Sequence, residues 1–194
     1  AGGLGSPVVL YLAAAGVGTI GIIDDDKVDL SNLQRQIAHT TARIGLSKVE
    51  SARDSIKDIN PDVLVNMHKE RLTEENAIDL VGSYDLVADG SDNFKTRFIA
   101  NDACFLTGTT LVSAAILRFD GQLSTYKAHL DDGQGQHPCY RCLFPEAPPP
   151  DTIPTCAEAG VMGAMCGVVG SLQATEVLKE LTGAGTSMSG SLLI

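Results

Sequence analysis

The chain has no tryptophan, and aromatic residues of all kinds make up only 5% of its 194 residues. Basic residues are also scarce: 14 Lys and Arg stand against 24 Asp and Glu, which gives a net charge of -10. An acidic protein has no general electrostatic attraction for a nucleic-acid backbone or an anionic membrane, so we expect neither as a partner. Apolar runs as long as the roughly 20 residues of a membrane-spanning helix are lacking too. Any phosphate group that the chain binds must therefore be bound by a few local residues.

The sequence has no charged leader with an apolar run and a cleavage site, and its five cysteines are an odd number. These two observations predict a reduced, cytoplasmic location. With 44% hydrophobic residues, the chain is long enough for one sizeable core, so we expect a single domain over residues 1–194. It opens on a glycine loop at Ala1–Gly5 without an apolar strand ahead of it, and we expect a first strand upstream.

Strand-like and helix-like segments alternate along the chain. Helices are expected over residues 4–15, 49–59, 73–81, 93–107 and 160–181, and strands over residues 19–23, 63–67, 84–88, 109–116 and 121–128. This alternation predicts a doubly wound, Rossmann-like α/β fold with a mainly parallel sheet. A turn at Phe119–Gly121 predicts an antiparallel pair, so that the sheet becomes mixed toward the C-terminal half. Six of the eight prolines lie between Pro138 and Pro154, which predicts a long crossover loop over residues 138–160.

The glycine loop and the carboxylate that follows it suggest a nucleotide site. Gly2 and Gly3 would let the backbone approach a phosphate at the N-terminus of the next helix. Asp24 lies 21 positions after Gly3, at the end of the next strand, where a carboxylate can accept hydrogen bonds from a ribose. A glycine turn that only packs helix on strand is the alternative, and the motif does not separate NAD from ATP. Asp25 and Asp26 are expected to be solvated loop acids.

Three polar residues downstream favour a triphosphate over a dinucleotide. Asn32, Arg35 and Lys48 would add cationic and amide contacts that a pyrophosphate at a helix terminus does not require. Taken singly, Arg35 and Lys48 are most simply surface charges, and Asn32 a turn residue.

Several motifs occur together in one order along the chain. They are residues 1–6 (AGGLGS), Asp24, residues 31–36 (SNLQRQ), 45–50 (GLSKVE), 91–93 (SDN), 139–142 (CYRC) and 159–161 (AGV). Jointly they resemble the ThiF/MoeB/HesA family, relatives of the ubiquitin-activating enzymes, over nearly the whole chain. The resemblance implies an enzyme that uses ATP and Mg²⁺ to adenylate the C-terminal glycine carboxylate of a small ubiquitin-like sulfur-carrier protein ending in Gly-Gly.

The resemblance also assigns residues. Gly2 and Gly3 would pack against the nucleotide, Asp24 would hold the ribose, and Asn32, Arg35 and Lys48 would contact the phosphates. Asp92 would lie near the α-phosphate and Mg²⁺. From the residues alone, the segment 91–93 could equally be only a helix cap, and Asp89 is a less favoured metal-side residue.

The cysteines give two further expectations. Cys139 and Cys142 have the spacing of one zinc knuckle, and in the family a second such pair near the C-terminus completes the site. That pair is not in this sequence, so we expect a tail beyond it, with His137 and a partner, or redox-active thiols, as alternatives. Cys156 matches a family position that in some members links covalently to the carrier, and an inert loop thiol is the alternative. Cys104 and Cys166 are expected in the core.

The sequence therefore predicts a MoeB-type adenylyltransferase, a homodimer by resemblance, with a sulfurtransferase as a further possible partner. The product would be a carrier acyl-adenylate plus pyrophosphate, and the pathway, molybdopterin or thiamine, stays open. Three alternatives remain: an NAD-dependent oxidoreductase, an inactive scaffold half of a heterodimeric activating enzyme, and the branch of the family that dehydrates tRNA adenosines.

Overall fold

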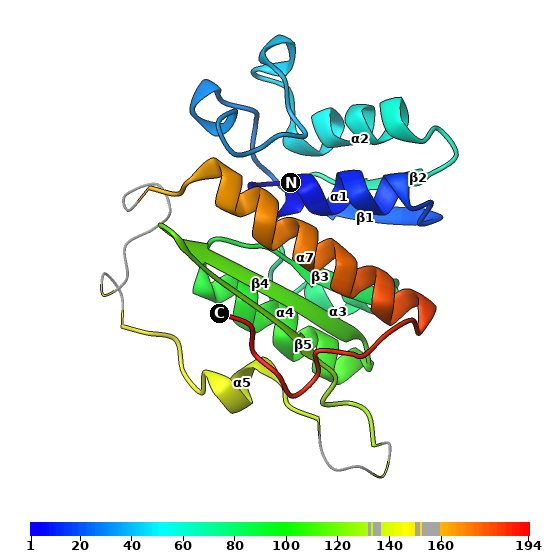
Figure 1. Cartoon of the computed structure of the whole chain (residues 1–194), viewed down its shortest axis with the longest axis vertical. Helices are drawn as coiled ribbons and strands as arrows, with labels where there is room; N and C mark the ends of the chain where they lie inside the picture. The colour runs from blue at the N-terminus through cyan, green and yellow to red at the C-terminus, as the bar shows by residue number, and fades with distance from the viewer. Residues whose placement is uncertain (132, 134–136, 150–151, 153–159) are drawn as a thin grey trace.

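The computed structural model describes residues 1–131, 133, 137–149, 152 and 160–194. The helices are α1 (Gly5–Ala14), α2 (Lys48–Ile59), α3 (Ala77–Val81), α4 (Phe94–Thr107), α5 (Tyr140–Leu143) and α7 (Gly163–Thr182), and the strands are β1 (Thr19–Ile23), β2 (Leu64–His68), β3 (Leu86–Asp89), β4 (Thr110–Leu117) and β5 (Asp120–Tyr126). Two short 3-10 helices, η1 (Leu30–Asn32) and η2 (Thr41–Arg43), precede α2. The expected alternation of strands and helices is confirmed (Figure 1).

The strands pair as the sequence predicts, in parallel first and antiparallel last. β1 pairs in parallel with β2, with Thr19 opposite Leu64, and β3 pairs in parallel with β4. β4 then pairs with β5 in antiparallel fashion through a turn at Arg118, whose φ of 56° lies in the left-handed region. The mixed character of the C-terminal half is thus confirmed. The two ladders form separate hydrogen-bonded sheets, β1–β2 and β3–β4–β5.

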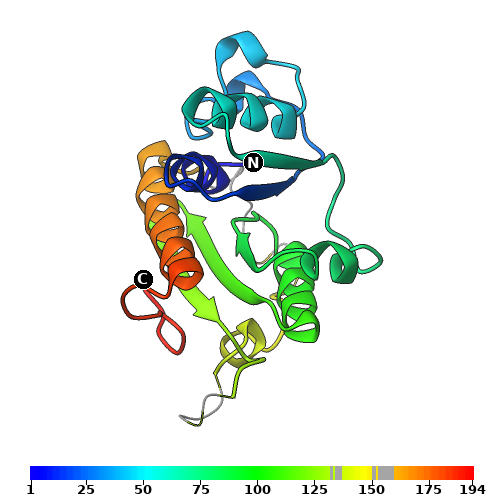
Figure 2. The same cartoon turned by 90° about the vertical axis from the view of Figure 1, so that its right-hand side faces the viewer.

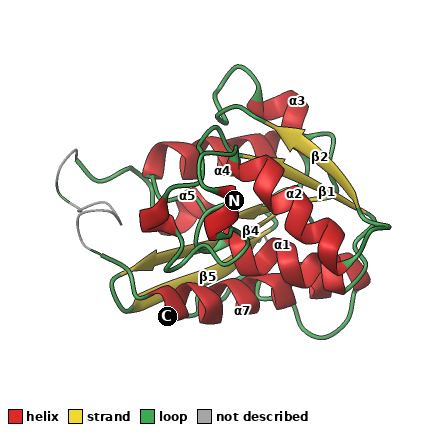
Figure 3. Cartoon of the chain, turned by 90° about the horizontal axis from the view of Figure 1, so that it is seen from above, coloured by secondary structure: helices red, strands yellow, loops and turns green. Residues whose placement is uncertain are grey.

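Helices cover both faces of the larger sheet. Figure 2 shows α7 on one face of the β3–β4–β5 sheet and α4 on the other. α1 runs beside α7 (Figure 3), and the contact is close because Gly170 has no side chain: a Cβ there would lie 2.4 Å from Pro7 Cγ and 2.7 Å from the Leu4 carbonyl oxygen. None of the helices in the described residues has the length and apolar character needed to cross a membrane.

Two predicted elements differ from the structure. The helix expected over residues 73–81 begins only at Ala77, because the Thr73 N–H donates to Asn76 Oδ1 at 2.8 Å and closes a turn first. The predicted loop over residues 138–160 contains the one-turn helix α5. Tyr140 causes this exception, since its buried ring packs against the rings of Phe98 and Phe144.

The carboxyl ends of β1 and β3 meet the start of α1. Asp24 follows β1, and its Oδ2 lies 2.9 Å from the nitrogen of Ala1, four residues before α1. Gly90 follows β3, and a Cβ built on it would lie 3.0 Å from Leu4 Cβ. In open α/β sheets ligands bind outside the carboxyl ends of the strands, so this junction is where a site is expected.

Candidate functional site

The glycine loop brings two glycines to the N-terminus of α1, each with a different role. Apart from Gly2 itself and its two chain neighbours, no heavy atom of the described residues lies within 4 Å of a Cβ built on Gly2, so the backbone is open to a ligand there. A Cβ on Gly3 would instead lie 2.8 Å from Cys166 Sγ and 3.5 Å from Arg35 Cγ. Gly3 is therefore required by the packing of α7 and of the Arg35 stem, whereas Gly2 leaves room at the positive end of the helix dipole.

Asp24 is held beside this loop. Its Oδ1 accepts the backbone N–H of Asp26 at 2.9 Å, and the side chain is only 14% exposed. A carboxylate held in this way at the end of β1 is in the place expected for a ribose-binding group. The ribose role itself stays a prediction.

Lys48 and Arg71 pair with the two acids that follow Asp24. Lys48, the first residue of α2, places Nζ 2.8 Å from Asp26 Oδ2, and Arg71 Nε donates to Asp25 Oδ2 at 2.7 Å. Asp25 and Asp26 are exposed, as expected for loop acids, but each has a cationic partner that the sequence did not indicate. Lys48, predicted to contact phosphate, is thus held at the site through a carboxylate.

Arg71 is the residue that the sequence analysis missed. The hydrogen bond that Arg71 donates to Asp25 is the main reason why the pKa of Arg71 lies above its usual value, and the negative charges of Asp26 and Asp92 raise it further. Arg71 therefore lies within electrostatic reach of both carboxyl-end loops. The available signal was its position three residues after β2, at the same edge of the sheet as Asp24.

Asn32 and Arg35 lie on the loop between β1 and α2. Asn32 Oδ1 accepts the Asp29 N–H at 3.4 Å as part of a capping box, so the amide has the turn role that the simpler interpretation gave it. Arg35 Nη1 donates to the Ser31 carbonyl at 3.1 Å while its stem contacts the Gly3 position. The structure thus brings Arg35 to the glycine loop and leaves Asn32 engaged within its own turn.

Asp92 is exposed, just after β3, and it is not the cap of the next helix. The cap of α4 is Asn93, whose Oδ1 accepts the Thr96 N–H at 2.9 Å. The interpretation of the segment 91–93 as a cap is correct for Asn93 only. The Asp92 carboxylate has one recorded hydrogen bond, from Asn93 Nδ2 at 3.5 Å, which is a weak contact. Asp92 therefore presents an exposed carboxylate on the loop after β3, two residues beyond Gly90, which packs against Leu4, and an exposed carboxylate is what a metal-side role requires.

The two cysteines of the predicted knuckle fit half of a zinc site. Cys139 and Cys142 have their Sγ atoms 3.8 Å apart. Two thiolates on one tetrahedral zinc ion, at about 2.3 Å each, would be separated by about 3.8 Å. α5 begins directly after Cys139 and contains Cys142, and Figure 1 shows it below the β4–β5 pair, on the side of the larger sheet away from α1. A zinc ion there would act on structure.

Of the other three cysteines, two are buried and one lies outside the described residues. Cys104 and Cys166 are buried, which confirms that they belong to the core, and burial raises the pKa of the Cys104 thiol to about 12. Cys156, the predicted carrier-linking thiol, lies outside the described residues. His137 Nδ1 lies 2.8 Å from Ser189 Oγ.

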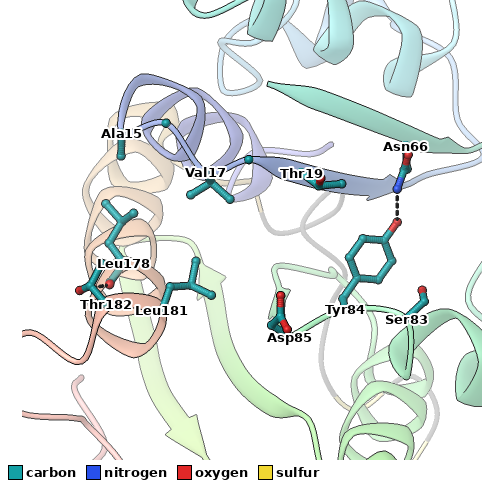
Figure 4. A pocket seen from close by; sticks show the side chains of 12 residues that line it. Ala15, Val17, Thr19, Asn66, Ser83, Tyr84, Asp85, Leu178, Leu181 and Thr182 are labelled. Carbon is teal, nitrogen blue, oxygen red and sulfur yellow. Dashed lines mark hydrogen bonds between the residues drawn. The ribbon is translucent and has the colours of Figure 1, made fainter. Parts of the chain in front are cut away.

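A cavity of about 590 Å³ lies away from the predicted site residues. Figure 4 shows it between the amino end of β1 at Thr19, the Tyr84–Asp85 segment before β3, and the end of α7. Asn66 Nδ2 donates to Tyr84 Oη at 3.3 Å on its wall. It opens at the amino ends of the strands, whereas Asp24 and Asp92 follow the carboxyl ends. None of the predicted site residues lines it.

The fold and the carboxyl-end junction place the chain in the doubly wound α/β class. More narrowly, the chain belongs to the ThiF family, whose model matches residues 1–194.

Named relatives agree with that family. The chain is 53% identical over 194 residues to a Mycobacterium tuberculosis protein named "Probable adenylyltransferase/sulfurtransferase MoeZ", covering 100% of this chain and 49% of the relative. It is 50% identical to a Thermus thermophilus "Sulfur carrier protein adenylyltransferase", covering 100% of this chain and 71% of the relative. It is 51% identical over 193 residues to the Mus musculus "Adenylyltransferase and sulfurtransferase MOCS3", covering 100% of this chain and 41% of the relative. The chain spans about half the length of the first of these.

Solved structures share the fold. A crystal structure of Escherichia coli MccB with MccA-N7isoASN gives a TM-score of 0.81 at 20% identity, covering 96% of this chain and 56% of that chain. MccB with ATP gives a TM-score of 0.74 at 22% identity, covering 96% and 55%. At these identities the likeness supports the fold alone.

Proposed function

We propose that this chain is the adenylation domain of an ATP-dependent enzyme that activates the C-terminal glycine carboxylate of a ubiquitin-like sulfur-carrier protein ending in Gly-Gly. The observation that carries the proposal is the charged groups beside the glycine loop: the Arg35 stem lies against Gly3, and Lys48 is paired with Asp26, two residues after Asp24. Asp92 lies on the loop after β3, whose Gly90 packs against Leu4. The names of the relatives, which include sulfur carrier protein adenylyltransferase, give the proposal independent support.

The chemistry needs charge compensation and no nucleophilic side chain. An oxygen of the carrier carboxylate attacks the α-phosphorus of ATP, a new P–O bond forms, and the bond to the bridging oxygen breaks to release pyrophosphate. Arg35, Lys48 and the backbone N–H groups at the start of α1 stabilise the negative charge that moves onto the leaving group. Asp24 orients the ribose. The exposed carboxylate of Asp92 is a suitable oxygen ligand for Mg²⁺, which supplies further charge neutralisation when bound.

Two competing functions fit the site less well. A dinucleotide-dependent oxidoreductase has no use for Arg35 beside the glycine loop or for Lys48 with Asp26. An enzyme acting on tRNA would bind a polyanion, and the net charge of -10 opposes that. Between carriers for molybdopterin and for thiamine synthesis the proposal makes no choice.

We also propose a structural zinc ion and protein partners for this chain. Cys139 and Cys142 would supply two thiolates to a structural zinc ion. Cys156 would take part by forming a covalent link to the carrier during sulfur transfer. A sulfurtransferase would then be the sulfur donor. A homodimer fits the apolar stripe on α7, where Val168 and Leu172 lie one turn apart and are 54% and 42% exposed.

ATP–pyrophosphate exchange, with and without a carrier ending in Gly-Gly, tests the proposal directly. We expect carrier-dependent exchange in the wild type and a loss of at least about tenfold in Asp92→Asn, which keeps the shape and removes the charge. Asp62→Asn, an exposed acid in the α2–β2 turn, is the matched control and should exchange normally. Measurable ATP binding without exchange for any carrier would reject the proposal, and normal exchange in Asp92→Asn would remove that residue from it.

A further inference from the structure

Behind the exposed Asp92 lies a group of buried polar side chains that the proposed chemistry does not use. Arg97, in the first turn of α4, is 7% exposed, and Asp89, the last residue of β3, is 5% exposed. Their nearest charged atoms, Arg97 Nη1 and Asp89 Oδ2, are 3.9 Å apart. Burying an ion pair is costly, and apolar residues of similar volume would often pack at least as well. The pair therefore calls for an explanation other than packing.

Both side chains bind the main chain of Ser91, the residue before Asp92. Asp89 Oδ1 accepts the Ser91 N–H at 2.9 Å, and Arg97 Nη2 donates to the Ser91 carbonyl at 2.5 Å. Ser91 thus has its backbone donor and its backbone acceptor fixed by two different elements. On the other side of Asp92, Asn93 is fixed as the cap of α4.

Arg97 and Asp89 also form hydrogen bonds with β4 and α7. Arg97 Nη1 donates to the Ala114 carbonyl at 2.9 Å, and Ser113 Oγ donates to Asp89 Oδ2 at 2.9 Å, which joins both residues to β4. From α7, the fully buried Gln173 donates through Nε2 to the carbonyl oxygens of Asp89, at 2.8 Å, and of Val112, at 3.0 Å. The 90–93 segment is thereby tied to β3, β4, α4 and α7 together.

From this geometry we infer that Arg97, acting with Asp89, is a positioning residue for adenylation: it fixes the Ser91 main chain so that the Asp92 carboxylate is held in its reactive orientation. The inference rests on the proposed function for the role of Asp92. A carboxylate on an exposed loop would sample many orientations, and preorganised charge is worth more to a transition state than mobile charge. Arg97 itself is buried, so it acts through the Ser91 main chain.

Two measurements on Arg97→Met test this. The first is amide hydrogen exchange of a peptide covering residues 90–96 in the nucleotide-free protein, which we expect to become at least about tenfold faster. The second is pyrophosphate exchange, in which kcat should fall at least about tenfold and the Mg²⁺ midpoint should rise, while KM for the carrier stays within about twofold.

The matched control is Thr125→Val, which removes a different buried hydrogen bond, from Thr125 Oγ1 to Glu176 Oε1 at 2.8 Å, in β5. It should lower the melting temperature without changing kcat, the Mg²⁺ midpoint or the 90–96 amide exchange. Equal losses of activity in the two variants at equal stability would overturn the inference, because the effect would then be general destabilisation.

Two milder variants test the same inference if Arg97→Met does not fold. Arg97→Lys keeps a cation with fewer donors, and Ser113→Ala removes only the hydroxyl donor to Asp89; both should show the same two effects at smaller size. Unchanged amide exchange in these folded variants would overturn the inference. If the wild type shows no carrier-dependent exchange, the proposed function fails, and the amide-exchange comparison alone then decides whether Arg97 fixes the 90–93 segment.

Discussion

Lys48 Nζ lies 2.8 Å from Asp26 Oδ2, and the lysine side chain is only 8% exposed. A cation held in this way is already aimed at the edge of the sheet where the glycine loop begins, with little rotamer freedom left to lose on binding. Asp26 is 55% exposed, so solvent keeps the attraction between the two groups modest and the lysine can exchange its partner for a phosphate.

This relationship predicts opposite effects for its two members. Lys48→Met should weaken ATP binding and lower the pyrophosphate-exchange rate by at least about tenfold, because a phosphate-binding charge is lost. Asp26→Asn should leave ATP affinity unchanged or raise it, since the lysine loses a competing anion. Isothermal titration with ATP measures both. Equal weakening in both variants would mean that the ion pair acts only on structure.

Arg71 should tune the affinity of the site for Mg²⁺. Its guanidinium pairs with Asp25 and lies in the field of Asp26 and Asp92, so it opposes a second cation there. Arg71→Gln should therefore lower the Mg²⁺ concentration for half-maximal exchange by about two- to threefold, and added salt should shrink the difference. Arg141→Gln, which breaks an exposed pair with Asp102, is the control and should leave the midpoint unchanged. A raised midpoint in Arg71→Gln would contradict this reasoning.

The cysteine knuckle should affect stability and not chemistry. Cys139→Ser should lose bound zinc and melt at a lower temperature, because a structural zinc ion contributes folding free energy. Elemental analysis of the purified protein gives the zinc content per chain, and calorimetry the melting temperature. Cys104→Ala, a change at a buried thiol in α4, should retain the metal. A zinc-free wild type would show that the pair has another use.

Glu176 should make stability depend on pH. This residue of α7 is 2% exposed, and burial works to raise its pKa; the hydrogen bonds from Lys179, from the Met188 N–H and from Thr125 outweigh burial, so the pKa lies below the ordinary 4.5. A folded-state pKa below the unfolded value stabilises the fold fully above that unfolded value, and the contribution is lost as the pH falls through the folded-state pKa. The stability advantage of wild type over Glu176→Gln in urea should therefore be constant near neutral pH and shrink in acid. An advantage that stays the same below about pH 4 would contradict the ion-pair explanation.

Two glycines of α7 should respond oppositely to alanine. Gly170→Ala places a Cβ against Pro7 and the Leu4 carbonyl, so it should lower the free energy of unfolding by about 1–3 kcal/mol. For Gly167→Ala, the new Cβ has no heavy atom of the described residues within 4 Å apart from its chain neighbours and the adjacent backbone of α7, so this variant should be neutral or up to about 1 kcal/mol more stable. Urea titrations of both variants decide this: an equal loss in Gly167→Ala would contradict the open position of that glycine, and no loss in Gly170→Ala would contradict the close contact between α1 and α7.

Local patterns in the sequence predicted most elements. β1 begins and ends at the predicted residues, because a short β-branched run between glycines and acids has few alternatives. The first turn of the helix expected from Thr73 failed, since the Asn76 side chain closed a competing turn that propensity alone does not reveal. α5 was missed because the buried position of Tyr140, between α4 and β5, depends on rings far away in the sequence.

For the candidate site, too, some features could be predicted from the sequence and others could not. The sequence by itself determined the glycine loop, the acid after β1 and the set of charged residues, because backbone freedom and residue chemistry are local properties. Only the tertiary structure decided that Asn93 caps α4 while Asp92 stays exposed, that Arg71 pairs with Asp25, and that Arg97 and Asp89 hold Ser91. These outcomes depend on which strand ends come together and on which buried polar groups must find partners, and both are set by packing between segments that are distant in the sequence.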